Sequence, residues 1–188
     1  MHPHLRSIAF AFLVLGAEFS YAQVPAVDEP PPQQQIASSN ADQAWRPSDD
    51  QRKAIESVTR RYFALRDSGK VEQAYALVSP RQKQYLPLST FSRLVDEFNA
   101  KAGAAQTRTL RKVTWYKDTP QAGPGLYVAV DFSSKFENLA LHCGYIVWQE
   151  QPDGSFLQVR EDVNVIDNAT MSKLGPERLA QVRAQFRC

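Results

Sequence analysis

The chain has 188 residues, of which 43% are hydrophobic and 11% aromatic, so it is long enough for one domain with a substantial core. Its 22 basic and 20 acidic side chains leave a net charge of +2, which excludes the strong positive field typical of nucleic-acid-binding proteins. Two cysteines are too few for a small disulfide-rich scaffold and lack the spacing of a zinc site. No glycine-rich phosphate loop, G-x-S-x-G elbow or C-x-x-C motif occurs, so no cofactor is expected.

The first 22 residues have the pattern of a signal peptide. A short segment with one positive charge precedes the apolar run from Ser7 to Ala17, and Ser20 and Ala22 supply small residues at the −3 and −1 positions of a cleavage site. A membrane-spanning helix needs about 20 apolar residues, so this run is too short to span a bilayer. We expect cleavage after Ala22 and a periplasmic location in a bacterium, the alternative being an uncleaved anchor.

Residues 23–46 are predicted to form a disordered linker. The segment holds four prolines and three successive glutamines, a composition that cannot bury enough apolar surface to offset the entropy of the chain. Trp45 is the one residue here that we expect to dock on the domain. The segment is either an inert spacer or a tail that binds a partner.

Three helices are predicted between residues 47 and 103. The first begins after Ser48, which fits a capping box with Gln51, and ends at Gly69. The second is short and closes at Pro80, and the third runs from Ser89 to Gly103. Apolar residues at helical spacing mark the buried face of the first helix, namely Ile55, Val58, Tyr62 and Leu65. Its arginines are expected to be solvated, namely Arg60, Arg61 and Arg66.

Alternating apolar residues predict four antiparallel strands after the helices. The expected strands are 107–117, 126–133, 139–149 and 156–167, with a tight turn at Pro152-Asp153-Gly154. A basic cluster on the first strand is expected to be a solvated strand face, with a phosphate-binding patch as the alternative: Arg108, Arg111 and Lys112. Residues 168–188 form an extension whose helix begins at Pro176.

Helices followed by a long antiparallel sheet give an α+β fold in the order of a cystatin-like or nuclear-transport-factor-two-like cone, in which helices pack on a curved sheet. The chain more closely resembles the exported bacterial domain-of-unknown-function family 4019 over residues 48–167. The motifs that carry this resemblance are Asp67-Ser68-Gly69-Lys70, Gly125-Leu126-Tyr127-Val128-Ala129-Val130 and Pro152-Asp153-Gly154-Ser155-Phe156. The resemblance implies a single α+β domain over 47–167 and export, and no known activity.

Glu161 is the most informative polar residue of the sequence. Under strict alternation it shares a strand face with Leu157, Val159, Val163 and Val165. An unpaired buried carboxylate is costly, so Glu161 requires a partner, a pocket or a raised pKa. One interpretation is a general base or ligand-fixing group in a pocket with Tyr62 or Tyr145. The alternatives are a β-bulge near Arg160 that turns Glu161 outward and an ion pair with an arginine of the first helix.

Cys143 and Cys188 are expected to form a disulfide in an oxidising compartment, which would tie the C-terminal helix to the sheet. The alternative is a buried Cys143 thiol with Cys188 either free or paired with a second chain. His142 is the only histidine left after signal cleavage, so a histidine-rich metal site is excluded and no metal is expected.

The expected function is that of a non-enzymatic exported module. It binds an envelope protein through the open face of the sheet, or it holds a small apolar ligand in its pocket. Tyr127, Tyr145 and Trp148 supply aromatic surface for a partner or for a homodimer. We expect no nucleic acid and no stable membrane anchor after cleavage.

Two other classes of protein stay open. One is an enzyme of ketosteroid-isomerase type with Glu161 as its base, a chemistry that also needs a neutral acid and a tyrosine at the oxyanion. The sequence places no second acid there. The other is a structural component of an envelope assembly such as a secretion apparatus.

Overall fold

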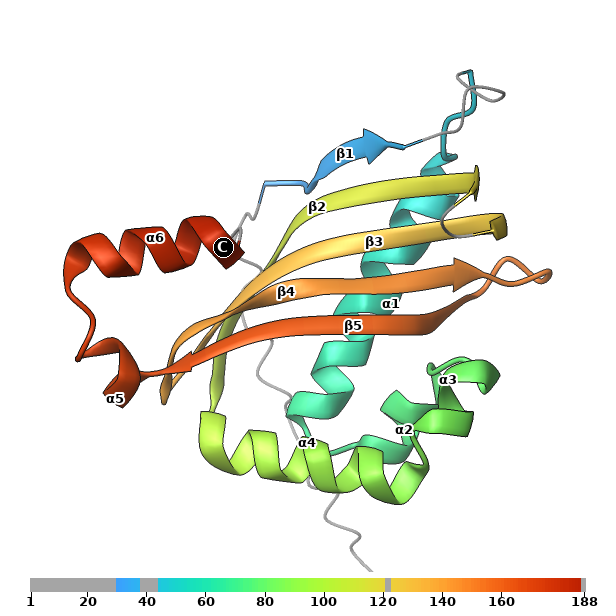
Figure 1. The fold of residues 1–188 in the computed structure, drawn as a ribbon. Helices are drawn as coiled ribbons and strands as arrows, with labels where there is room; N and C mark the ends of the chain where they lie inside the picture. Colours follow the sequence, from blue (N-terminus) through green and yellow to red (C-terminus); the bar gives the residue numbers. More distant parts are fainter. Residues whose placement is uncertain (1–29, 38–43, 121–122, 187–188) are drawn as a thin grey trace, which may run out of the picture.

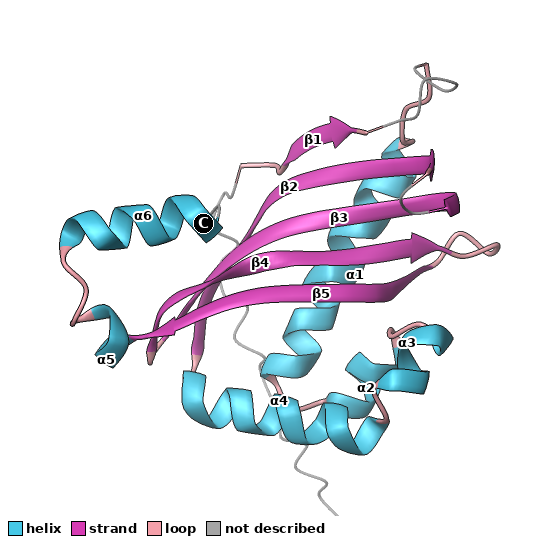
Figure 2. Ribbon diagram, viewed as in Figure 1, coloured by secondary structure: helices cyan, strands magenta, loops and turns pink. Residues whose placement is uncertain are grey.

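The computed structural model describes residues 30–37, 44–120 and 123–186, and its centre is a twisted five-stranded sheet (Figures 1 and 2). The strands lie in the order β1-β2-β3-β4-β5, and α1 crosses one face of the sheet. The strands are β1 (Gln33–Ile36), β2 (Ala105–Thr119), β3 (Gly123–Phe136), β4 (Leu139–Glu150) and β5 (Phe156–Asp167). The helices are α1 (Asp49–Asp67), α2 (Val71–Ala76), α3 (Pro80–Tyr85), α4 (Leu88–Ala102), α5 (Asn168–Met171) and α6 (Pro176–Phe186).

The expectation of a four-stranded antiparallel sheet is wrong by one strand. Strands β2 to β5 are antiparallel to their neighbours, but β1 adds a fifth strand that runs parallel to β2, with Gln33 opposite Lys112 and Ile36 opposite Trp115. This strand lies inside the segment 23–46, which the composition predicts to be disordered.

Polar contacts explain why a glutamine-rich segment forms a strand here. The buried indole Nε1 of Trp115 donates to Gln34 Oε1 at 2.8 Å, and the backbone N–H of Ala37 donates to the carbonyl of Trp115 at 2.8 Å. These bonds satisfy the edge of β2 without burying large apolar side chains. Trp45 docks as expected, with its ring 6.2 Å from that of Trp115.

The start of α1 follows the predicted capping box. Ser48 Oγ accepts from the Gln51 backbone N–H at 3.1 Å, and Gln51 Oε1 accepts from the Ser48 backbone N–H at 2.9 Å. The chain leaves α1 through Gly69 at φ 70°, a left-handed conformation that glycine adopts without steric cost. The sheet-facing side of α1 joins a core whose largest fully buried side chains include Trp115, Trp148, Tyr62 and Phe132.

The second helix ends earlier than predicted. It stops at Ala76, and Pro80 begins the separate helix α3, with Ser79 Oγ accepting from the Gln82 backbone N–H at 3.2 Å. Between these helices the chain pairs with the edge of β5, because the Ser79 N–H donates to Gln158 O and the Gln158 N–H donates to Leu77 O, both at 2.8 Å. This pairing holds α3 beside β5.

A β-bulge in β5 changes which residues share a face. Arg160 lies opposite Val147 but Gln158 lies opposite Trp148, so Val159 is the extra residue. Gln158 therefore faces the helices, and so does Glu161, which is opposite Ile146. The prediction that Glu161 shares a face with Leu157 and Val159 is wrong for this reason. A bulge near Arg160 exists, but it keeps Glu161 on the helix-covered side.

The expected C-terminal helix begins at Pro176, as α6. None of the helices in the described ranges is long and apolar enough to cross a membrane. The predicted signal peptide, residues 1–22, and Cys188 lie outside the described residues.

Candidate functional site

Glu161 meets the last turns of α1 on the helix-covered side of the sheet. Arg66 Nη1 lies 2.6 Å from Oε1 and 2.8 Å from Oε2 of Glu161, and the Tyr62 hydroxyl donates to Oε2 at 3.0 Å. Tyr62 and Arg66 reach one carboxylate because residues four apart share a helix face. The structure therefore contains the predicted Tyr62 contact together with the predicted ion pair to an arginine of the first helix.

The pKa shifts of Tyr62 and Arg66 favour their bonds to Glu161. Burial, followed by the charge of Glu161, raises the pKa of Tyr62, so its hydroxyl keeps its proton and donates. Burial alone would lower the pKa of Arg66, but the facing Glu161 carboxylate and Tyr62 raise it above its usual value. The expectation that Arg66 is solvated is wrong, since 19% of its side chain is exposed. Both oxygens of Glu161 are thus occupied by donors.

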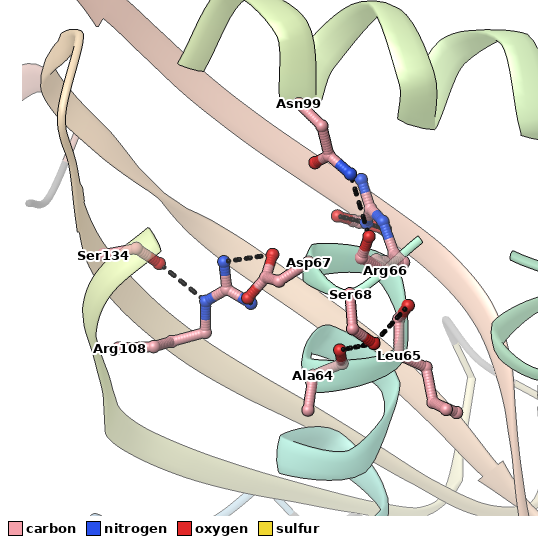
Figure 3. A network of polar contacts seen from close by, with 9 residues as sticks. Ala64, Leu65, Arg66, Asp67, Ser68, Asn99, Arg108 and Ser134 are labelled. Carbon is pink, nitrogen blue, oxygen red and sulfur yellow. Dashed lines mark hydrogen bonds and ion pairs between the residues drawn. The ribbon is translucent and has the colours of Figure 1, made fainter. Parts of the chain in front are cut away.

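A second ion pair joins α1 to β2 (Figure 3). Arg108 Nη1 lies 3.0 Å from Asp67 Oδ2, and Arg108 Nε donates to Ser134 Oγ at 2.8 Å. The guanidinium carbon lies 4.1 Å from the centre of the Phe63 ring. Burial raises the pKa of Asp67 and lowers that of Arg108, while the attraction between the two charges opposes both shifts. The two pairs and Tyr62 form what we name the inner polar cluster: Tyr62, Arg66, Glu161, Asp67 and Arg108.

Arg108 is a residue that reasoning from the sequence assigned to solvent. Its side chain is 14% exposed, so the solvated-face prediction is wrong for it. A signal was present, because Arg108 stands two residues before the buried Leu110 and alternation places both on one face. A hydrogen bond also connects the inner polar cluster to α4, because Asn99 Nδ2 donates to the carbonyl of Arg66 at 2.9 Å (Figure 3).

His142 lies on the same covered face but belongs to an aromatic environment. Its ring centre is 5.2 Å from that of Phe98, 5.6 Å from Phe132 and 5.0 Å from Phe136. Nδ1 is buried and has no hydrogen-bond partner among the described residues. Burial, followed by the charges of Arg108 and Arg66, lowers the pKa of His142 to about 3. The ring is therefore neutral at physiological pH.

Tyr145 lies on the opposite face of the sheet from Glu161. Its hydroxyl donates to Asp162 Oδ2 at 3.4 Å, and the Arg160 guanidinium carbon lies 5.4 Å from the centre of its ring. The structure thus brings Glu161 and Tyr62 together but not Tyr145. Cys143 is buried on this second face, opposite Ser133 and Asn164, and its predicted disulfide involves a residue outside the described ranges.

The open face of the sheet carries a groove of about 1320 Å³, which we name the outer groove. Its floor includes Tyr116, Tyr127 and Tyr145, and the first two are directly opposite each other on β2 and β3. Gln149 Nε2 donates to the Tyr127 hydroxyl at 3.1 Å. Trp148, grouped with these tyrosines by the sequence, is fully buried on the helix-covered side instead.

Three other elements form the rim of the outer groove. Gln33 of β1 lines it beyond β2, Tyr85 of α3 lines it beyond β5, and Phe186 of α6 lines it at a third side. Tyr85 is 75% exposed. Charged side chains also line the groove, four of them basic and one acidic: Arg81, Arg111, Lys112 and Arg160, with Asp131. Within the described ranges, no group of three or more His, Cys, Asp or Glu side chains is placed to hold a metal ion.

Comparison with known proteins gives one family. A family model described as "Protein of unknown function (DUF4019)" matches residues 58–159. The matched stretch begins within α1 and ends within β5, so it holds most of the inner polar cluster and of the groove floor, whereas Glu161, β1 and α6 lie outside it. No curated protein matches the chain.

Proposed function

Since the chain belongs to the family of proteins of unknown function DUF4019, whose description assigns no activity, we propose from its surface chemistry that it is an exported, non-enzymatic module that binds a partner protein through the outer groove. The observation that carries this proposal is the size and lining of the groove. Pockets for small ligands enclose roughly 300–1,000 Å³. A groove of about 1320 Å³, with the sheet as its floor and three further elements at its rim, suits a segment of a macromolecule better than a small apolar ligand.

The residue types in the groove support a protein partner. Tyrosine and arginine are enriched at protein–protein interfaces, where they contribute disproportionately to affinity. Tyr116, Tyr127 and Tyr145 line the floor, and Arg160 stacks on the last of these. On the helix-covered side, in contrast, Trp115, Trp148 and Tyr62 are at most 1% exposed, so the space that a small apolar ligand would need is filled by side chains.

The bonding of Glu161 weighs against the isomerase-type alternative. A general base must reach the substrate with a free oxygen. Arg66 contacts both oxygens of Glu161, and Tyr62 donates to one of them. The triad therefore acts as a tie between α1 and β5.

Two further features belong to this proposal. Export to the periplasm is supported by the signal pattern of residues 1–22. A cone of the cystatin-like or nuclear-transport-factor-two-like kind is supported by α1 lying across one face of a twisted sheet (Figure 1). In such a cone the helices cover one face, and the other is left for a partner or a second copy.

Site-specific photocrosslinking in living cells tests the proposal. A photoreactive phenylalanine analogue at Tyr127 samples the groove floor, and the same analogue at Leu94, which is 46% exposed on α4, is the matched control. We expect a discrete protein adduct from position 127 that position 94 does not give. A homodimer adduct at 127 identifies the partner as a second copy. Equal labelling at both positions, or none at 127, contradicts the proposal.

A further inference from the structure

We infer that the outer groove binds an extended acidic peptide segment of its partner, an inference that rests on the proposed function and adds the chemistry of the ligand. The first argument is charge. Four basic side chains line the groove against Asp131, and Asp162 beside it pairs with Arg160. The lining of the groove therefore holds more basic than acidic side chains. Complementary charge steers association and rejects like-charged partners.

The existing ion pairs leave the groove positive. Lys112 Nζ lies 2.9 Å from Asp131 Oδ2, and Arg160 Nη2 lies 3.2 Å from Asp162 Oδ2. All four of these side chains are more than a third exposed, so an incoming carboxylate can reach either cation. Arg81 adds a further cation at the lining, so an acidic segment meets three cations along the groove, Arg81, Lys112 and Arg160.

The second argument is the spacing of the aromatic floor. Tyr127 is opposite Gln149, and Tyr145 stands four residues before Gln149 on β4, so the backbone positions of the two tyrosines are about 13 Å apart along the strand direction. Such a separation matches roughly four residues of extended chain. Aromatic grooves accept extended, proline-containing peptides because these lose little conformational entropy on binding. Gln149 and Asn164 supply amide groups that can pair with a peptide backbone.

Fluorescence anisotropy with the full mature chain tests this chemistry. The probes are fluorescein-labelled decapeptides of alternating Glu and Pro and of alternating Lys and Pro. We expect the Glu–Pro peptide to bind at least about tenfold more tightly, with an affinity that falls as salt rises from about 50 to about 300 mM. An unlabelled acidic polysaccharide, oligogalacturonate, serves as a competitor, and we expect it to compete less well than unlabelled Glu–Pro peptide.

Charge-removing variants locate the binding. The double variant Arg81→Gln/Arg160→Gln should weaken Glu–Pro binding about threefold to tenfold, whereas Arg93→Gln, which removes an exposed cation on α4, should leave it unchanged. Equal binding of both peptides, equal effects of the groove and control variants, or stronger competition by oligogalacturonate would overturn the inference. If position 127 crosslinks to a protein while the acidic peptide does not bind, the inference fails and the proposed function stands. If position 127 gives no adduct, both the inference and the proposed function are contradicted.

Discussion

At the scale of single residues, the inner polar cluster explains how charged side chains are tolerated under α1. Each carboxylate faces an arginine, and each arginine also contacts an aromatic ring: Arg66 lies over Tyr62 and Arg108 over Phe63. Burying an ion costs free energy that only close partners offset. The pairs therefore tie the end of α1 to β5 and β2, and removing one partner leaves the other charge buried without compensation.

We predict that Glu161→Gln destabilises the protein by about 2 kcal/mol, because Arg66 then keeps its charge without a counterion. Urea denaturation monitored by circular dichroism measures this loss. Glu97→Gln on α4 is the matched control, since its pair with Arg93 is about half exposed and should contribute below about 0.5 kcal/mol. The double variant Arg66→Met/Glu161→Met should recover part of the loss. An effect at Glu161 no larger than at Glu97 would show that the pair is not structural.

His142 makes the protein sensitive to acid. Its pKa is about 3 in the folded protein and near 6.5 when the chain is unfolded, so the unfolded state binds the proton first as pH falls. Stability from this group is complete above about pH 6.5 and is lost progressively down to about pH 3, with a slope of up to about 1.4 kcal/mol per pH unit.

Two variants test the histidine. His142→Phe suits the three neighbouring phenylalanines and removes the buried unpaired nitrogen, and His142→Gln keeps a polar group. Both should flatten the dependence of the unfolding free energy on pH between about 4 and 6, measured by urea denaturation at each pH. An unchanged slope in both variants would assign the acid sensitivity to other groups.

The sequence identifies only some residues of the inner polar cluster, and the reason is physical. Glu161 and Tyr62 could be singled out, because a carboxylate within an apolar strand and a tyrosine on an apolar helix face both stand out in the sequence. The charge of Arg66 led to the wrong prediction that its side chain is solvated. Its long side chain instead reaches back to Glu161. The face of Glu161 depended on the Val159 bulge, which has no local signature in the sequence.

At the scale of elements, local patterns predicted most of the α+β framework. The capping box at Ser48, the turn at Gly154 and the strands of the sheet from β2 onward follow from side-chain alternation and turn chemistry. Strand β1 could not be predicted in this way. Its stability comes from pairing with a strand far along the chain and from the Trp115–Gln34 hydrogen bond, and neither is visible in the composition of residues 33–36.

Gly144 sets how closely β4 and β5 approach. A Cβ atom placed on it would lie 2.0 Å from the backbone oxygen of Asp162, a group that cannot move aside without breaking the strand pairing. We predict that Gly144→Ala destabilises the protein by about 3 kcal/mol. Gly175→Ala is the control, because no atom lies within 4 Å of its added Cβ, and it should change stability by less than about 0.5 kcal/mol. Thermal and urea unfolding of both variants compares them, and similar stabilities would contradict the predicted contact.

At the scale of the whole molecule, one measurement tests both the expected export and the expected disulfide. If export, cleavage and the Cys143–Cys188 bond are as expected, intact mass spectrometry of protein recovered from the periplasm should give a chain that begins at Gln23 and is two hydrogens lighter than its reduced form. Closing a loop of this length stabilises by about 4 kcal/mol on the chain-entropy estimate. A mass that includes residues 1–22 would contradict cleavage, and two alkylatable thiols under denaturing, non-reducing conditions would contradict the bond.

The two faces of the sheet could be anticipated only in outline. Aromatic side chains beyond the needs of a one-sided core indicated that one face of the sheet is open, and Tyr127 and Tyr145 line the groove on that face. The rim could not be anticipated, since Gln33, Tyr85 and Phe186 come from three elements whose arrangement depends on tertiary packing. The groove is a property of the assembled molecule and of no single segment.

Strand β1 has a consequence for the order in which the molecule is built. Of the strands in the described ranges it is the first to leave the ribosome, yet its pairing partner, residues 112–115 of β2, is made much later. Until residues 112–115 have been made, Gln33–Ile36 has no strand to pair with. Because β1 belongs to the same chain, covering the edge of β2 requires no second molecule, and this protects that edge from pairing with another chain.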